Sequence, residues 1–75
     1  MTPPGFDGLP PRLRKLVPLL ANAATNAAIA DALVLSLGTV EQYVSEMKES
    51  LRAEDRGHLV LMCHQHVHGE DYPAG

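Results

Sequence analysis

The carboxyl-terminal part of the chain holds the residues that most readily bind a metal ion. They are His58, Cys63, His64, His66 and His68. On a continuous helix His64 and His68 would stand four residues apart on one face, a spacing that suits a pair of metal ligands. A tetrahedral site needs four ligands, however, and the chain offers no second matched pair. We therefore interpret the segment as a solvated histidine tail without a metal, and Cys63 as a small buried apolar residue.

No other set of residues has a spacing that is typical of catalysis. The chain shows no nucleophile paired with a base, no glycine-rich phosphate loop and no two carboxylates on facing elements. We expect a protein that is not an enzyme and that needs no cofactor. What remains is a binding protein, whose contact residues depend on the helices that position them.

The stretch from Thr25 to Leu51 predicts two helices joined by a tight turn that contains Gly38. Thr25 is a good N-cap, because its hydroxyl can accept a free N–H of the first turn, and Ser36 offers a second N-cap. The short first helix carries apolar residues at helical spacing, namely Ile29, Ala30 and Leu33. The longer second helix, about residues 37–51, carries the stripe Val40, Val44, Met47 and Leu51. This order of elements is the plan of a helix-turn-helix.

The same periodicity identifies the side chains that the second helix turns away from the core. At about 100° per residue, they fall on an arc opposite the apolar stripe. They are Glu41, Gln42, Ser45, Lys48, Glu49 and Arg52. If this is a recognition helix, these side chains reach into a groove of DNA. Otherwise they form the solvated face of an ordinary amphipathic helix.

An earlier helix should precede this pair. It begins near Pro11, and its apolar face consists of Leu13, Leu16, Val17 and Leu20. Pro18 lies inside this stretch and removes a backbone hydrogen bond, so we expect a kink or an early break there. We expect Asn22 to adopt the left-handed conformation that turns the chain toward the next helix.

The last helix is predicted from about Asp55 to about His66. Glu54 and Asp55 lie at its start, where carboxylates suit the positive end of the helix dipole. One apolar face is formed by Leu59, Val60 and Cys63. Leu61 points away from that face, and it is either a singly exposed leucine or part of a symmetric dimer seam.

Composition and charge limit the functions that the chain can serve. Its 75 residues allow one small domain, and 45% of them are apolar. The formal net charge is −3, and basic and acidic residues balance between Leu9 and Met62. That balance indicates DNA binding that is weak or assisted by a partner, since phosphate contacts normally need a basic surface. The single cysteine, together with the absence of an apolar run of about 20 residues, predicts a cytoplasmic protein outside the membrane.

An ordered series of short motifs spans the chain from Leu9 to about Met62. It comprises Leu9-x-Pro11-Arg12-x-Arg14, Leu19-Leu20-Ala21, Asn26-x-x-Ile29-Ala30-x-x-Leu33, Ser36-x-Gly38-Thr39-Val40, Ser45, Leu51 and Asp55-Arg56. This series resembles the LuxR-type (FixJ/GerE-like) helix-turn-helix family. The resemblance implies an all-α, four-helix domain that binds DNA and whose last helix commonly serves dimerisation. We assign residues 9–66 to this domain and residues 1–8 and 67–75 to flexible tails.

The resemblance also implies roles for individual residues. Base reading is implied for Glu41, Gln42 and Ser45. Contacts with the DNA backbone are expected from Asn26, Ser36, Thr39, Tyr43, Lys48 and Arg52. Self-association through the last helix would involve Leu61, Met62 and Gln65. Several backbone candidates also have a structural interpretation, because Ser36 and Thr39 can cap a helix and Tyr43 can pack against the first helix.

Two functions follow from these observations. The first is a sequence-specific, dimeric transcriptional regulator that binds double-stranded DNA, with a second copy and another regulator or RNA polymerase as further partners. The second is an interaction protein that keeps the fold and pairs with another LuxR-type regulator without strong DNA binding of its own. Acidic residues on the helix at about residues 37–51, the third helix of the domain, favour the second function, and they are Glu41, Glu46 and Glu49. Gln42 and the intact turn favour the first.

Overall fold

The structure, a computed structural model, describes Phe6 and residues 8–68 of the 75-residue chain. Within this described part the chain forms helices and turns and no strand. The helices are α2 (Pro11–Arg14), α3 (Val17–Ala21), α4 (Asn26–Leu33), α5 (Leu37–Leu51) and α6 (Arg56–His68). If α2 and α3 are counted as the two halves of the first helix, this is the all-α, four-helix domain that the sequence predicts.

The two flexible tails predicted for residues 1–8 and 67–75 lie for the most part outside the described residues. Of these stretches the structure describes Phe6, Gly8, Val67 and His68. α6 continues through His68, beyond its predicted end near His66. In the described part of the chain, no single helix is long and apolar enough to cross a membrane, and α4 and α5 pass that test only as a pair bent by 110°.

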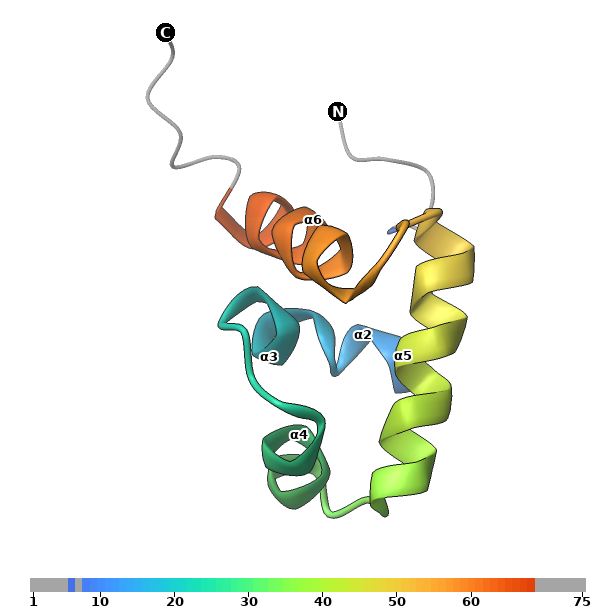
Figure 1. The fold of residues 1–75 in the computed structure, drawn as a ribbon, viewed down its shortest axis with the longest axis vertical. Coiled ribbons are helices and arrows are strands. Elements are labelled where there is room, and N and C mark those ends of the chain that lie inside the picture. The colour runs from blue at the N-terminus through green and yellow to red at the C-terminus, as the bar shows by residue number, and fades with distance from the viewer. Residues whose placement is uncertain (1–5, 7, 69–75) are drawn as a thin grey trace, which may run out of the picture.

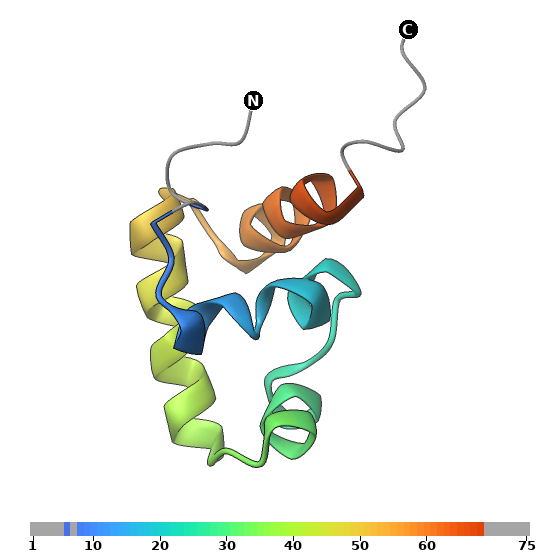
Figure 2. The same cartoon turned by 180° about the vertical axis from the view of Figure 1, so that it is seen from behind.

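α5 stands along one side of the molecule, and the other helices pack on one side of it (Figure 1). The α2–α3 segment runs away from α5, with α6 on one side of it and α4 on the other, and the view from behind agrees (Figure 2). α3 packs along α6, and α4 packs against α5. The core between these helices is mainly aliphatic, and its largest fully buried side chains are Leu13, Leu16, Leu20, Ile29, Val40, Met47, Leu59 and Cys63.

The first helix is interrupted just before Pro18. α2 ends at Arg14, and α3 begins at Val17 with Pro18 in its first turn. In that position the missing N–H of proline costs nothing, because first-turn N–H groups have no partner within the helix. The predicted break is therefore confirmed. It also removes the cost that a proline in the interior of a continuous helix would carry.

Three helices end on a left-handed residue that is not glycine. Their φ angles are 60° at Ala23, 57° at Val34 and 58° at Arg52. The N–H of the following residue bonds back to the carbonyl five residues earlier, from Ala24 to Leu19, from Leu35 to Ala30 and from Ala53 to Lys48. This is the Schellman arrangement, which satisfies carbonyl groups at a helix end. The three donor residues also pack against the core.

Two predictions about these turns are wrong. Asn22 has a φ of −94°, and the left-handed conformation falls on Ala23, because the helix runs through Ala21 and the Schellman bonds form one residue later than expected. The predicted range of about 37–51 for the second helix of the pair is confirmed, so Gly38, although also predicted in the turn, lies in the first turn of α5. The reason is that Ser36 caps α5 and starts it at Leu37. The left-handed residue that turns the chain is Val34.

Candidate nucleic-acid interface

α4 and α5 form a helix-turn-helix. The two helices are bent by 110° at the short turn that joins them, within the range of about 90–120° that is typical of this motif. Thr25 caps α4, since its hydroxyl accepts the N–H of Ala28 at 3.1 Å. Ser36 caps α5 by accepting the N–H of Thr39 at 3.1 Å. Both predicted caps are confirmed, and each fixes the residue at which its helix begins.

α5 has a buried face and an exposed face. The predicted apolar stripe is buried and consists of Val40, Val44, Met47 and Leu51. The three side chains expected to read bases are exposed on other sides of the helix, and they are Glu41, Gln42 and Ser45. Because the rest of the domain packs on one side of α5 (Figure 1), its free side can approach a partner without rearrangement of the core.

The residues expected to contact the DNA backbone differ in their surroundings. The hydroxyl groups of Ser36 and Thr39 lie 2.8 Å apart and form a hydrogen bond at the start of α5. Tyr43 is partly buried against the core. Lys48 is half-buried and Arg52 is exposed. These two cations line a shallow depression together with Ser45, Glu49, Ala53 and Glu54. The carboxyl end of α5 thus presents two cations beside the carboxylates of Glu49 and Glu54, whereas its amino end presents hydroxyl groups.

Asn26 is joined to α6. The guanidinium group of Arg56, the first residue of α6, donates to Asn26 Oδ1 at 2.5 Å and to the carbonyl oxygen of Ala24 at 2.6 Å. We call these two bonds the Arg56 latch. The latch ties the start of α4 to the start of α6, which lies 30 residues later in the chain. A contact between Asn26 and a phosphate would use the amide NH₂ group, which is the donor end of this side chain.

One acidic residue of α5 is paired within the domain. Glu46 Oε1 lies 2.7 Å from Nη2 of Arg12 on α2, and both side chains are partly exposed. Such a surface ion pair contributes only about 0–1 kcal/mol to stability. Its effect on charge matters more, because it draws one carboxylate toward α2. Of the other charged residues, Glu41 and Glu49 are exposed on α5, and Glu49 lines the depression that Lys48 and Arg52 share.

Comparison with known families identifies this arrangement. The sequence model of the family described as bacterial regulatory proteins, luxR family, matches residues 7–63. The chain belongs to the LuxR family. The match covers more than half of the 75 residues and runs from before α2 into α6, so the resemblance inferred from the motifs is confirmed. Proteins of this family are DNA-binding regulators and are typically not enzymes. No curated protein and no solved structure matches the chain.

In this LuxR-type domain α6 buries one side and exposes the other. Leu59 and Cys63 are fully buried. Leu61 is 52% exposed, which confirms its predicted direction, and Gln65 is exposed four residues later. Met62 is partly buried against the core. The three residues expected in a dimer seam therefore share one region of α6, but Met62 also contributes to the core.

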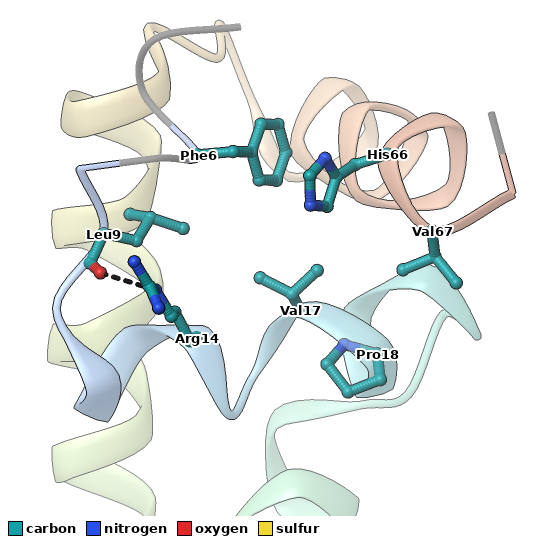
Figure 3. Close-up of a pocket in the computed structure, with 7 residues that line it drawn as sticks. All are labelled: Phe6, Leu9, Arg14, Val17, Pro18, His66 and Val67. Carbon is teal, nitrogen blue, oxygen red and sulfur yellow. Dashed lines mark hydrogen bonds between the residues drawn. The ribbon is translucent and has the colours of Figure 1, made fainter. Parts of the chain in front are cut away.

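A contact that the sequence analysis missed joins Phe6 to α6. Phe6 is 5% exposed, and its ring stacks on that of His66, with the centroids 4.1 Å apart and the planes 7° from parallel. Figure 3 shows the two rings beside a groove, with Arg14 donating to the carbonyl oxygen of Leu9 at 2.9 Å. His66 is exposed, as the interpretation as a solvated segment requires, but it belongs to α6 and also packs its ring on Phe6. The available signal was the single phenylalanine of the chain.

The other histidines of α6 do not build a closed site with Cys63. The rings of His64 and His68 lie 4.7 Å apart. Among Phe6 and residues 8–68, no group of three or more histidine, cysteine or acidic side chains could hold a metal ion. Burial raises the pKa of the Cys63 thiol to about 11. The thiol therefore stays protonated and unreactive at neutral pH, as expected for a buried apolar residue.

Proposed function

We propose that this protein is a sequence-specific regulator of transcription that binds double-stranded DNA by placing α5 in the major groove. The observation that carries the proposal is the division of α5, whose apolar stripe anchors it in the core while Glu41, Gln42 and Ser45 stand exposed. A helix with side chains is about 10–12 Å wide, and the major groove is about 12 Å wide. α4 would cross the DNA backbone as the bracing helix. The site of action would be the cytoplasm, where bacterial DNA lies.

The exposed side chains suggest which bases would be read. The amide of Gln42 can accept a hydrogen bond from N6 of adenine and donate one to N7. The carboxylate of Glu41 can only accept, which suits the N4 amino group of cytosine. The hydroxyl of Ser45 both donates and accepts, so it tolerates several bases. A good bidentate pair discriminates by about 1–3 kcal/mol, so we expect Gln42 to contribute most to specificity.

Contacts with the DNA backbone would hold the helix in register. Lys48 on α5 and Arg52 just beyond its end line the same depression and supply the positive charge that phosphate attracts. Ser36 and Thr39 would offer hydroxyl groups near the other end of the helix. Asn26 and Tyr43 complete the set that we propose for positioning, which carries no sequence information by itself.

We further propose that two copies associate through α6. Leu61 is a half-exposed leucine on the side of α6 that faces away from the core, and Gln65 follows it by about one turn. A symmetric pair would bury Leu61 of both copies against each other, which is worth roughly 1.5–3 kcal/mol for each leucine. Dimerisation would also present two copies of α5 to two half-sites of DNA.

A second function is favoured by the balanced charge of the exposed face of α5. Glu41 and Glu49 balance Lys48 and Arg52 there, whereas phosphate contacts normally need an excess of positive charge. In this alternative the domain pairs through α6 with another LuxR-type regulator, or contacts RNA polymerase, and changes its partner's activity. The Arg12–Glu46 pair weakens the case for this alternative, because it takes a third carboxylate away from the exposed face.

DNA titrations with two variants distinguish these functions. The wild type is titrated with a selected duplex and with a mixed-sequence duplex at two salt concentrations. Gln42→Ala should lose about 1–3 kcal/mol on the selected duplex and little on the mixed one, because it removes a base contact. Glu49→Lys should tighten both and steepen the salt dependence by about one unit, because it adds a phosphate contact.

Each outcome separates the two accounts. Salt-dependent binding with the two distinct responses supports the proposed regulator and the orientation of α5. If the wild type binds neither duplex at either salt concentration, the first function is excluded. Association with another LuxR-type regulator that Leu61→Glu abolishes would then establish the second function.

A further inference from the structure

Gly38 is a glycine that the fold itself does not require. It is the second residue of α5, and its backbone is that of an ordinary helix. A Cβ atom built on Gly38 would meet nothing within 4 Å. Alanine at this position should stabilise the helix, because glycine is among the least favourable residues for helix formation. Neither turn geometry nor packing in the monomer therefore explains Gly38.

The position of Gly38 on α5 points to a binding partner as the reason for the glycine. Gln42 follows it by four residues and Ser45 by seven, so the three lie on one line along the helix, and all are exposed. The buried line that starts at Val40 repeats the same spacing on the opposite side of the helix. Gly38 thus occupies the end of the exposed line nearest the Ser36 cap. It lies about one turn before the residue that we expect to read adenine.

We propose that Gly38 is the point at which DNA comes closest to α5, with the edges of base pairs packed against bare main chain. This inference rests on the proposed function and names a further residue of that interface. Side chains extend the radius of a helix from about 2.3 Å to about 5–6 Å, so the missing side chain of Gly38 opens a local gap roughly 3 Å deep at this one position, into which the edge of a base pair can fit. A close contact there would hold Gln42, one turn farther along, beside the next base edges.

Two variants of Gly38 and one matched control test the inference. Gly38→Ala and Gly38→Leu add side chains of increasing size at the proposed contact. Gly57→Ala is the control, because Gly57 is likewise exposed and the second residue of its helix, α6, and its added Cβ would make only an ordinary 3.4 Å contact with Asp55 Oδ1. Thermal unfolding should show a melting temperature for both alanine variants that is equal to or above that of the wild type.

DNA binding should separate the variants. We expect Gly38→Ala to bind the selected duplex about tenfold more weakly, which is the scale of one lost base contact, and Gly38→Leu to bind more weakly still. Gly57→Ala should bind as the wild type does. Sedimentation of every variant shows whether dimerisation has changed, so that a loss of dimer is not mistaken for a loss of DNA contact.

The results also separate this inference from the proposed function. Wild-type binding to DNA that Gly38→Leu leaves unchanged would overturn the close approach at Gly38 and leave the regulator intact. Absence of wild-type binding would overturn both. A graded loss from glycine to alanine to leucine, with unchanged folding and dimerisation, establishes Gly38 as part of the interface.

Discussion

The two long helices of this domain distribute their apolar residues in different ways. Beyond its first turn, α5 keeps its aliphatic side chains on the buried side and polar ones on the other. α6 buries Leu59 and Cys63, yet it leaves Leu61 52% exposed and Val67 43% exposed. Polar side chains suit the hydrogen-bonding edges of bases, whereas exposed apolar residues suit a protein surface. The difference teaches that a single small domain can carry a polar surface on one helix and a partly apolar surface on another.

The largest effect is expected on the buried side of α5. Met47 is fully buried in the core. Met47→Ala should lower the free energy of unfolding by about 2–5 kcal/mol, because it removes buried methylene and sulfur contacts and leaves a cavity. Urea denaturation measures the change. Ser45→Ala on the exposed side is the control and should stay within about 0.5 kcal/mol of the wild type. Equal losses of unfolding free energy at Met47 and Ser45 would contradict the division of α5 into a buried and an exposed face.

The exposed side of α6 provides the next test. Leu61→Glu should raise the dissociation constant of the proposed dimer by at least about tenfold, because a charge would replace a leucine worth roughly 1.5–3 kcal/mol in the seam. Sedimentation equilibrium measures association. Leu61→Met is the matched control and should keep the dimer, since it preserves an apolar side chain of similar size. A wild type that remains monomeric at high concentration would show that this surface is not a self-association seam.

The stability of the domain should increase when Val34, in the turn between α4 and α5, is replaced by glycine. Val34 is 90% exposed and has a φ of 57°, which is unfavourable for a β-branched residue. Val34→Gly should raise stability by about 1 kcal/mol, since relief of about 1–2 kcal/mol of strain exceeds the entropic cost of glycine. Thermal unfolding measures the gain. Val34→Ala retains a Cβ atom and should gain less, and a lower melting temperature for Val34→Gly would disprove the strain.

The smallest effect is expected at the edge of α5 that faces α2. A double-mutant cycle of Arg12→Ala and Glu46→Ala should give a coupling energy of about 0.2–1 kcal/mol, because the pair is partly solvated. The coupling should shrink when salt is added. A coupling energy of several kcal/mol would contradict the view that the buried stripe, and not this surface pair, holds α5 in place.

Periodicity made much of the fold predictable. The residues of the α5 stripe, the caps at Thr25 and Ser36 and the break near Pro18 are local features, and local spacing or local hydrogen bonding determines them. The outward direction of Leu61 follows from the same helical geometry. The positions on α5 that we propose for base reading came from the family resemblance together with this periodicity.

The features that were missed depend on contacts between distant residues or on small shifts at helix ends. Phe6 is buried because it meets His66, sixty residues later in the chain, and no local pattern reports such a contact. The same holds for the bond between Arg56 and Asn26. The left-handed residue fell on Ala23 and not on Asn22, because one further residue of helix decides which position the Schellman bonds select.

The Arg56 latch also bears on the layout of the DNA that this protein would bind. Because the latch holds the start of α6 against the start of α4, α6 and the α4–α5 pair should move as one body. In a dimer joined through α6, each subunit would then hold its α5 at a set distance and angle from the other. One extra base pair between half-sites shifts one of them by about 3.4 Å and rotates it by about 34°. A rigid dimer could not follow that change, so the operator would admit a single spacing, and the Arg56 latch, with the packing of α6 along α3, would set it.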